Sequence, residues 1–96
     1  MTLMTFEPGN TIQFTFVSSV APNAAPNFAV RDKANTVIHS GTSATSDTTH
    51  FYALYTIPDG NEWYSGEWLA QKTVSGSVYD FIRRFGFRAL ETIAEN

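Results

Sequence analysis

Apolar residues recur at every second position along most of this chain, and this spacing constrains the fold more than any other feature of the sequence. The segment TIQFTF at residues 11–16 alternates polar and apolar side chains, and residues 51–58 and 78–90 repeat the pattern. Successive side chains of a strand point to opposite faces, so the alternation predicts strands with one buried face. Sustained helical spacing is absent from the sequence. The sequence therefore predicts an all-β protein.

Turn and loop signals divide the chain into short strands. They are Pro-Gly-Asn at 8–10, a loop at 18–27, a turn at 32–35, a polar loop or edge strand at 41–50, a turn at 59–62 and a tight hairpin at 74–78. With residues 1–6 counted as the first strand, this spacing predicts an immunoglobulin-like antiparallel β-sandwich of about seven strands. A small barrel is the alternative. We expect one such domain over 1–90 and a tail or short helical turn over 91–96.

Length and composition agree with a single small β domain. The 96 residues suffice for one domain with one core, and the aromatic content of 15% favours strands. The chain has no cysteine, so no disulfide supports the fold. Two packed sheets share a core of inward residues. We expect this core to contain Ile12, Phe14, Phe16, Phe28, Val30, Phe51, Tyr55, Ile57, Trp68, Phe81, Phe85 and Phe87.

The aromatic segment WYSGEWLA at residues 63–70 divides between the two faces of a strand. Tyr64 and Trp68 share one face with Gly66, and the small residue beside Trp68 leaves room for its ring. We therefore expect Trp68 in the core. Tyr64 follows a tight turn at the start of the sixth strand, which is the position of the tyrosine corner in immunoglobulin-like folds. Gly66 stands where antibody domains have a disulfide cysteine, so a true antibody-type domain is not expected.

The other face of that segment supplies candidate contact residues. Trp63 and Leu69 point outward there, as Tyr52 and Leu54 do in the preceding strand. Several exposed apolar residues on one small domain favour a contact surface over unremarkable exposure. Arginines near the C-terminus extend the candidate subunit interface, which comprises Tyr52, Leu54, Trp63, Leu69, Arg84 and Arg88.

The arginines also allow a simpler interpretation. Arg84 and Arg88 share the outward face, where pairing with Glu67 or Asp80 would account for them. Arg83 falls in the inward register, which predicts either a β-bulge at that point or a position at the rim of the sandwich.

No motif in the sequence indicates a chemical reaction. His39 and His50 lie in different segments without metal-ligand spacing, and the residues Asp-Gly-Asn-Glu at 59–62 are ordinary turn chemistry rather than a calcium loop. Serines are plentiful, but none lies in a Gly-x-Ser-x-Gly elbow. We therefore expect no catalytic, metal or cofactor site, no small-molecule substrate and no enzymatic activity.

Charge and hydropathy limit the classes of partner. The net charge of −3 argues against nucleic-acid binding, because that binding depends on neutralising phosphates. The N-terminal residues MTLMTFEPGN lack the basic and apolar regions of a signal peptide, and no segment approaches the roughly 20 apolar residues of a membrane span. We therefore expect synthesis in the cytoplasm and no membrane contact.

From residue 51 onward, four motifs follow one another along the chain. They are a strand with inward aromatic and small residues that ends at a Pro/Gly turn (Phe51, Ala53, Tyr55, Ile57 and Pro58), a Tyr-x-x-x-Trp-x-Ala strand (Tyr64, Trp68 and Ala70), a hairpin (Gly76) and a last strand closing on Phe-x-Phe (Phe85 and Phe87). With these motifs in this order, the second half of the chain resembles small immunoglobulin-like proteins of tailed bacteriophages and prophages. The opening segment FEPGNTIQFTF is similar to the first turn and strand of such domains.

This resemblance implies a structural role in a virion, as a head–tail connector, decoration or tail-associated subunit. The partners would be other virion proteins or further copies of the chain. The alternative function is a small module that binds carbohydrate or a host surface through the loop at 18–27, but that loop contains no aromatic or arginine anchor.

Overall fold

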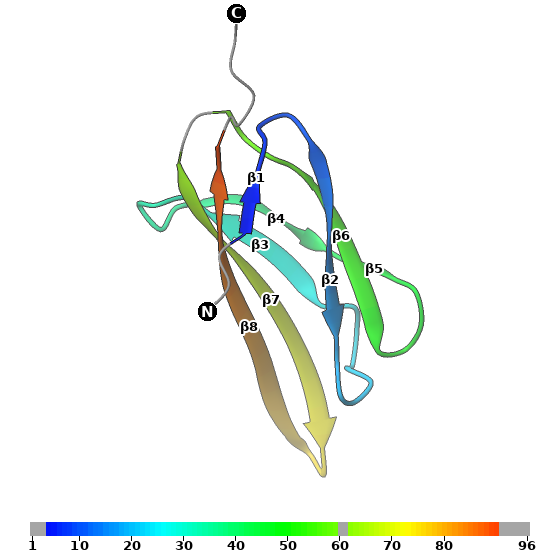
Figure 1. Ribbon diagram of the computed structural model, residues 1–96. Coiled ribbons are helices and arrows are strands. Elements are labelled where there is room, and N and C mark those ends of the chain that lie inside the picture. Colours follow the sequence, from blue (N-terminus) through cyan, green and yellow to red (C-terminus); the bar gives the residue numbers. More distant parts are fainter. Residues whose placement is uncertain (1–3, 60–61, 91–96) are drawn as a thin grey trace, which may run out of the picture.

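The computed structural model describes residues 4–59 and 62–90, and within these ranges the chain forms eight strands and no helix (Figure 1). The strands are β1 (Met4–Phe6), β2 (Thr11–Val17), β3 (Asn27–Arg31), β4 (Val37–Thr42), β5 (Ala44–Thr45), β6 (His50–Thr56), β7 (Trp63–Val74) and β8 (Ser77–Ala89). The predicted tail at 91–96 and the first three residues of the predicted first strand lie outside the described residues.

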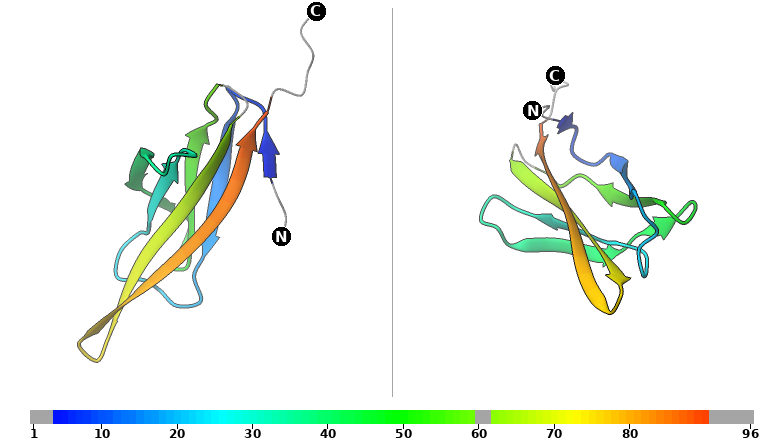
Figure 2. Two further views of the ribbon diagram at one scale, coloured as in Figure 1. Left: turned by 90° about the vertical axis from the view of Figure 1, so that its left-hand side faces the viewer. Right: turned by 90° about the horizontal axis from the view of Figure 1, so that it is seen from below.

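The strands form two sheets that pack face to face (Figure 2). One has the order β1-β8-β7-β3-β4 and the other the order β2-β6-β5. The neighbours β3-β7-β8 and β2-β6-β5 correspond to the C-F-G and B-E-D strands of an immunoglobulin domain. All pairings are antiparallel except that of β1, which runs parallel to β8. The predicted immunoglobulin-like β-sandwich is therefore confirmed, with eight strands rather than about seven.

The turns between β3 and β4 and between β7 and β8 lie where the sequence places them, and their backbone geometry explains their residues. Ser75 and Gly76 connect β7 to β8 with φ angles of 53° and 82°, as a two-residue turn with two left-handed positions requires. Between β3 and β4, the Asp32 carboxylate accepts the backbone N–H groups of Ala34 and Thr36, each at 2.9 Å. Side-chain bonds from Asp32 thus fix the turn between β3 and β4, and two left-handed backbone positions, one of them a glycine, form the turn between β7 and β8.

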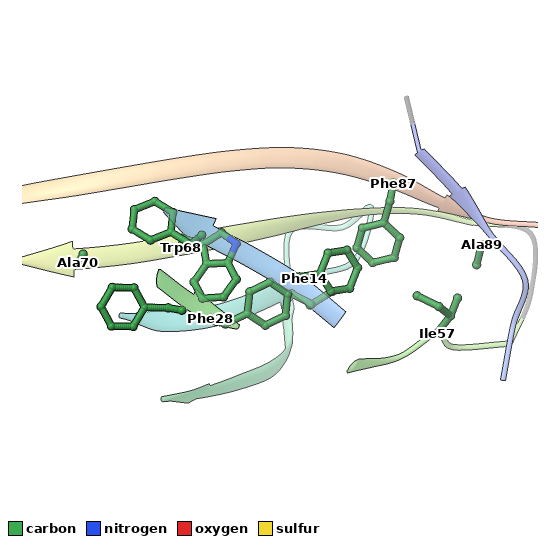
Figure 3. Close-up of a cluster of buried hydrophobic side chains, with 10 residues drawn as sticks. Phe14, Phe28, Ile57, Trp68, Ala70, Phe87 and Ala89 are labelled. Carbon is green, nitrogen blue, oxygen red and sulfur yellow. The ribbon is translucent and has the colours of Figure 1, made fainter. Parts of the chain in front are cut away.

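Aromatic side chains from both sheets fill the core (Figure 3). Trp68 of β7 is 1% exposed, and its ring stacks on Phe16 of β2 with centroids 5.5 Å apart. Phe14 continues the stack between Phe28 and Phe85, at 5.4 and 5.3 Å. These contacts join β2 to the strands opposite it, so the predicted alternation is confirmed. The buried hydrophobic residues are Phe14, Phe16, Phe28, Ala29, Val30, Phe51, Ile57, Trp68, Ala70, Phe87 and Ala89.

The prediction that Phe81 belongs to the core is wrong. Phe81 has the inward register, opposite Ala70, but its side chain is 38% exposed. The hairpin of β7 and β8 is longer than the other strands and runs past their ends (Figures 1 and 2). Phe81 lies beside a hollow at the end of β2, so the second sheet covers its side chain only in part. Ile12, Tyr55 and Phe85, which are nearer the sandwich edge, are only half-buried.

Asp47 organises the turn that leads into β6, and this gives a pH-dependent prediction. Its carboxylate accepts the backbone N–H of Thr49 at 2.8 Å and bonds the His50 ring at 2.8 Å. The Thr49 bond above all, with help from His50, lowers the pKa of Asp47 from 3.8 to about 2. Because the folded-state pKa lies below the unfolded value, this stabilisation of the turn is present above pH 3.8 and is lost as pH falls towards 2.

We expect the Asp47 carboxyl carbon to titrate in NMR with a midpoint of about 2. An Asp47→Asn variant should lose the corresponding change in the His50 amide resonance. A midpoint near the ordinary 3.8 would contradict the bonded turn.

Candidate functional site

The six predicted interface residues do not form one surface. Tyr52 and Leu54 lie on the outer face of the sheet that contains β6, where Leu54 is 59% exposed. The other four, Trp63, Leu69, Arg84 and Arg88, lie on the outer face of the opposite sheet, on β7 and β8. The sandwich core separates the two groups, so a single partner surface cannot contact both in the way the sequence analysis supposed.

Trp63 and Arg88 form a contact pair at the start of β7. They are direct cross-strand neighbours, and the Arg88 guanidinium carbon lies 5.6 Å from the centroid of the Trp63 ring. This distance is within the range of a cation–π contact. The Arg88 Nε is buried and has no hydrogen-bond partner among the described residues. Trp63 itself is 43% exposed, so the pair leaves part of an aromatic face open.

The remaining arginines occupy the middle of β8. The Arg84 Nε donates to the Glu67 carboxylate at 2.7 Å, which is the pairing that the simpler interpretation supposed. Arg83 faces inward in a ladder that runs without a register shift, so it lies at the rim and not at a bulge. Its guanidinium carbon lies 6.0 Å from the centroid of the Phe16 ring. Arg84 and Arg88 therefore lie on the outer face of the sheet, whereas Arg83 lies at the rim of the sandwich.

Tyr64 packs as a structural residue. Its ring stacks on Phe87 with centroids 5.5 Å apart, and partial burial, with the carboxylates of Glu62 and Asp32, raises the pKa of its hydroxyl. The upstream backbone that a tyrosine corner would use includes residues 60–61, which are outside the described part of the chain. The corner therefore stays a prediction.

The most exposed apolar surface lies at the far end of the β7–β8 hairpin, which we call the arm (residues 70–82). Sequence analysis missed it. The arm carries apolar side chains on both faces: Phe81 and Tyr79 on the inward face, Val78 and Ile82 on the outward face. The signal in the sequence was strand length, because two strands of 12 and 13 residues cannot be covered by strands of 5 to 7.

One edge of the arm is covered by the loop between β2 and β3. Beyond Leu69, β7 has no further pairing with β3. There the Asn23 N–H donates to the Gln71 carbonyl at 2.7 Å, and the Asn23 side chain bonds both the N–H and the hydroxyl of Thr73, at 3.1 and 2.8 Å. This loop, which the sequence suggested as a recognition loop, thus binds the arm through Asn23.

The opposite edge of the arm borders a groove along the side of the sandwich, which we call the side groove. Its larger part has a volume of about 570 Å³ and runs between β2 and β8. Phe14, Phe16 and Phe85 are among the aromatic side chains that line it, with Arg83 at its border. A second hollow of about 330 Å³ continues between the end of β2 and residues 80–83. Core aromatics are therefore accessible from the side beside the free edge of β8.

The two histidines lie apart and each contacts a different neighbour. The His39 ring lies 4.9 Å from the Tyr55 ring, whereas His50 bonds Asp47. Over residues 4–59 and 62–90, no three His, Asp or Glu side chains gather as a metal ion would need. The same ranges contain no helix of the length and hydropathy of a membrane span.

Comparisons of the chain with protein-family models, with curated proteins and with solved structures found no match. Function is therefore inferred from the geometry of the arm, the side groove and the outward arginines.

Proposed function

We propose that the chain is a non-enzymatic structural or assembly protein of a tailed phage or prophage particle, and that it acts through contacts between subunits. The observation that supports this most is the arm, whose apolar side chains Tyr79, Phe81 and Ile82 are exposed on a hairpin that extends past the sandwich. Contiguous apolar surface that is exposed on a small domain marks a protein–protein contact site.

The physical properties of the arm favour a partner that covers it. A two-stranded hairpin is marginally stable in water without a third strand or a packed face. In this arm Asn23 supplies bonds on the β7 side, but Phe81 and Tyr79 on the inward face are exposed. A neighbouring subunit that buried these rings would remove apolar surface from water and stabilise the arm in its extended position.

Particle incorporation tests this function. The chain should be found by quantitative mass spectrometry in purified particles of the phage or prophage that encodes it. A Tyr79→Ser/Phe81→Ser variant should be depleted from particles at least tenfold, because loss of two buried aromatic contacts exceeds the roughly 1.4 kcal/mol of a tenfold change.

Val37→Ser is the matched control, since the exposure of Val37 lies between those of Tyr79 and Phe81 and it lies on β4, at the other edge of the sheet. It should incorporate normally. Wild-type protein that is absent from the particles, or an arm variant that incorporates as well as the control, would contradict the proposed function.

The binding of carbohydrate or a host surface is less supported by the same geometry. The loop at residues 18–26 that would carry it has no aromatic side chain, and Asn23 is bonded to β7. A glycan array should therefore give no signal for the wild-type protein, and a reproducible hit would favour that alternative.

A further inference from the structure

We propose that two copies of the chain pair through the free edge of β8, antiparallel about a two-fold axis beside Ile82, to form one continuous sheet across the dimer. The inference deepens the proposed function, because it rests on subunit contact and names a second copy as the partner. Three features carry it: the unpaired backbone of β8, the order of charges along that strand, and the apolar groove beside it.

The backbone of β8 presents hydrogen-bonding groups along a free edge. β1 pairs with β8 only at Phe87–Ala89. Ala89 donates its N–H towards β7, to Glu62 at 2.9 Å, whereas Leu90 donates to Phe6 of β1 at 2.9 Å. Because these directions alternate along a strand, every second residue before Leu90 directs its backbone groups away from β7. The residues that present these groups at the free edge are Val78, Asp80, Ile82, Arg84 and Gly86.

Such an edge is a template for another strand. On the β7 side of the arm, the bonds from Asn23 cover the backbone. On the β8 side, the described residues place no strand beside 77–86. The side groove is lined by the consecutive residues 83–85, so it follows this part of the strand edge. A strand from a second copy can therefore approach along β8 where the chain itself leaves room.

Charge complementarity selects one register. An axis beside Ile82 sets Ile82 opposite the partner's Ile82 and Asp80 opposite the partner's Arg84. Opposite charges in directly facing positions stabilise an antiparallel pair, and like charges destabilise it. An axis beside Arg83 would oppose two arginines, and an axis beside Phe81 would set Arg84 opposite an apolar valine. Only the first of these three registers pairs acid with base at both symmetric positions.

The pairing extends charge rows that the single copy already contains. On one side of Arg84 lies Glu67, at 2.7 Å, and on one side of Asp80 lies Gln71, whose Nε2 donates to it at 2.9 Å. In the dimer, Arg84 would lie between Glu67 and the partner's Asp80. The row would run from Glu67 through Arg84 and the partner's Asp80 to the partner's Gln71. Each charged group would then have polar neighbours on both sides.

The same register places the exposed inward aromatics against the partner's side groove. Tyr79 would lie opposite the partner's Phe85, and Phe81 opposite the partner's Arg83. Phe85 and Arg83 both line the groove. The rings of the arm, which are exposed in their own copy, would thus cover the open side of the other sandwich. Backbone pairing and apolar burial arise from one arrangement.

Single cysteines test the register, because the chain has no cysteine of its own. In an Ile82→Cys variant the two introduced thiols would face each other with Cα atoms about 5.5 Å apart, within the range of a disulfide. The matched control is Val78→Cys, which lies on the same face of the same arm. Position 78 would face position 86 of the partner, so the two introduced thiols would be eight strand residues, or roughly 27 Å, apart. Under mild oxidation, Ile82→Cys should form a covalent dimer at least tenfold faster than Val78→Cys.

Charge reversal gives an independent readout. Wild-type protein should sediment at twice the monomer mass of 10.6 kDa. Asp80→Lys or Arg84→Glu alone should raise the dimer dissociation constant at least tenfold, and the double variant should restore it to within about threefold, because the reversed charges again face each other. Circular dichroism of each variant checks that the sandwich is intact.

Three results would overturn the dimer: wild-type protein that stays monomeric at millimolar concentration, cross-linking of Ile82→Cys no faster than of Val78→Cys, or a double variant no better than the single ones. These failures are distinct from failure of the proposed function, which is read from particles. Monomeric protein that incorporates through the arm would overturn this inference alone. A dimer through β8 that is absent from particles would overturn the function alone.

Discussion

Replacing Trp68 with alanine should lower the free energy of unfolding by about 3–5 kcal/mol, as for other large buried aromatics. The Trp68 ring is 1% exposed and touches both sheets. It stacks on Phe16 of β2 at 5.5 Å and tilts against Phe28 of β3 at 4.8 Å. Its removal would leave a cavity that Phe28 cannot refill without losing its ring contacts with Phe14 and Phe85. Urea unfolding followed by circular dichroism measures the loss.

The matched control is Trp63→Ala, five positions earlier on the same strand. Trp63 is 43% exposed and contacts the Arg88 guanidinium. Its loss should cost no more than about 1 kcal/mol, the value of an exposed cation–π contact. If Trp63→Ala unfolded the domain and Trp68→Ala did not, the facing assigned to β7 would be wrong by one residue.

Replacing Gly66 with alanine should lower the free energy of unfolding by about 1–3 kcal/mol, the usual cost of overpacking a core. Gly66 lies opposite Phe85 in the β7–β8 ladder, and a Cβ atom at Gly66 would lie 2.1 Å from the Phe85 Cζ. The ring itself stacks on Phe14 at 5.3 Å, so it cannot move without losing that contact. The absent side chain of Gly66 is therefore the space in which Phe85 packs.

A double-mutant cycle isolates this cause. Gly66→Ala and Phe85→Ala should each destabilise, whereas their combination should cost at least about 1 kcal/mol less than the sum, because the clash needs both the methyl group and the ring. Gly41→Ala is the control, since a Cβ atom at Gly41 meets nothing within 4 Å. Additive energies in the cycle would show that Gly66 is required for another reason.

The sequence was sufficient to predict the sandwich because each strand and turn has a recognisable local pattern. The alternation assigned Phe14 and Phe16 to the buried face of β2. The turn residues Ser75 and Gly76 marked the hairpin of β7 and β8 correctly. Each of these is a local signal: a period of two, or a backbone angle that few residues adopt. Local signals determine which face of a strand is inward, and in a two-layer protein that is most of the fold.

Local signals could not show what lies opposite a given inward face. Phe81 has the same alternation as Phe87, yet only Phe87 is buried. The difference arises from how far β2 and β6 extend, which depends on distant parts of the chain. The same limit affected the candidate site, where outward residues of two sheets were grouped although the core separates them. Burial is a property of the assembled layers rather than of one strand.

The parallel pairing of β1 with β8 also has a consequence for the time at which the protein can fold. The sheet partner of the first described strand is the last, and β8 is also the only link between β1 and the rest of its sheet. During synthesis, Met4–Phe6 can therefore not pair within its sheet until β8 has left the ribosome. The strands β7 and β8 can pair as soon as both are available, because they are adjacent in the chain. Synthesis of β8 thus both extends the sheet and fixes β1, so that closure of this sheet waits for the last described strand.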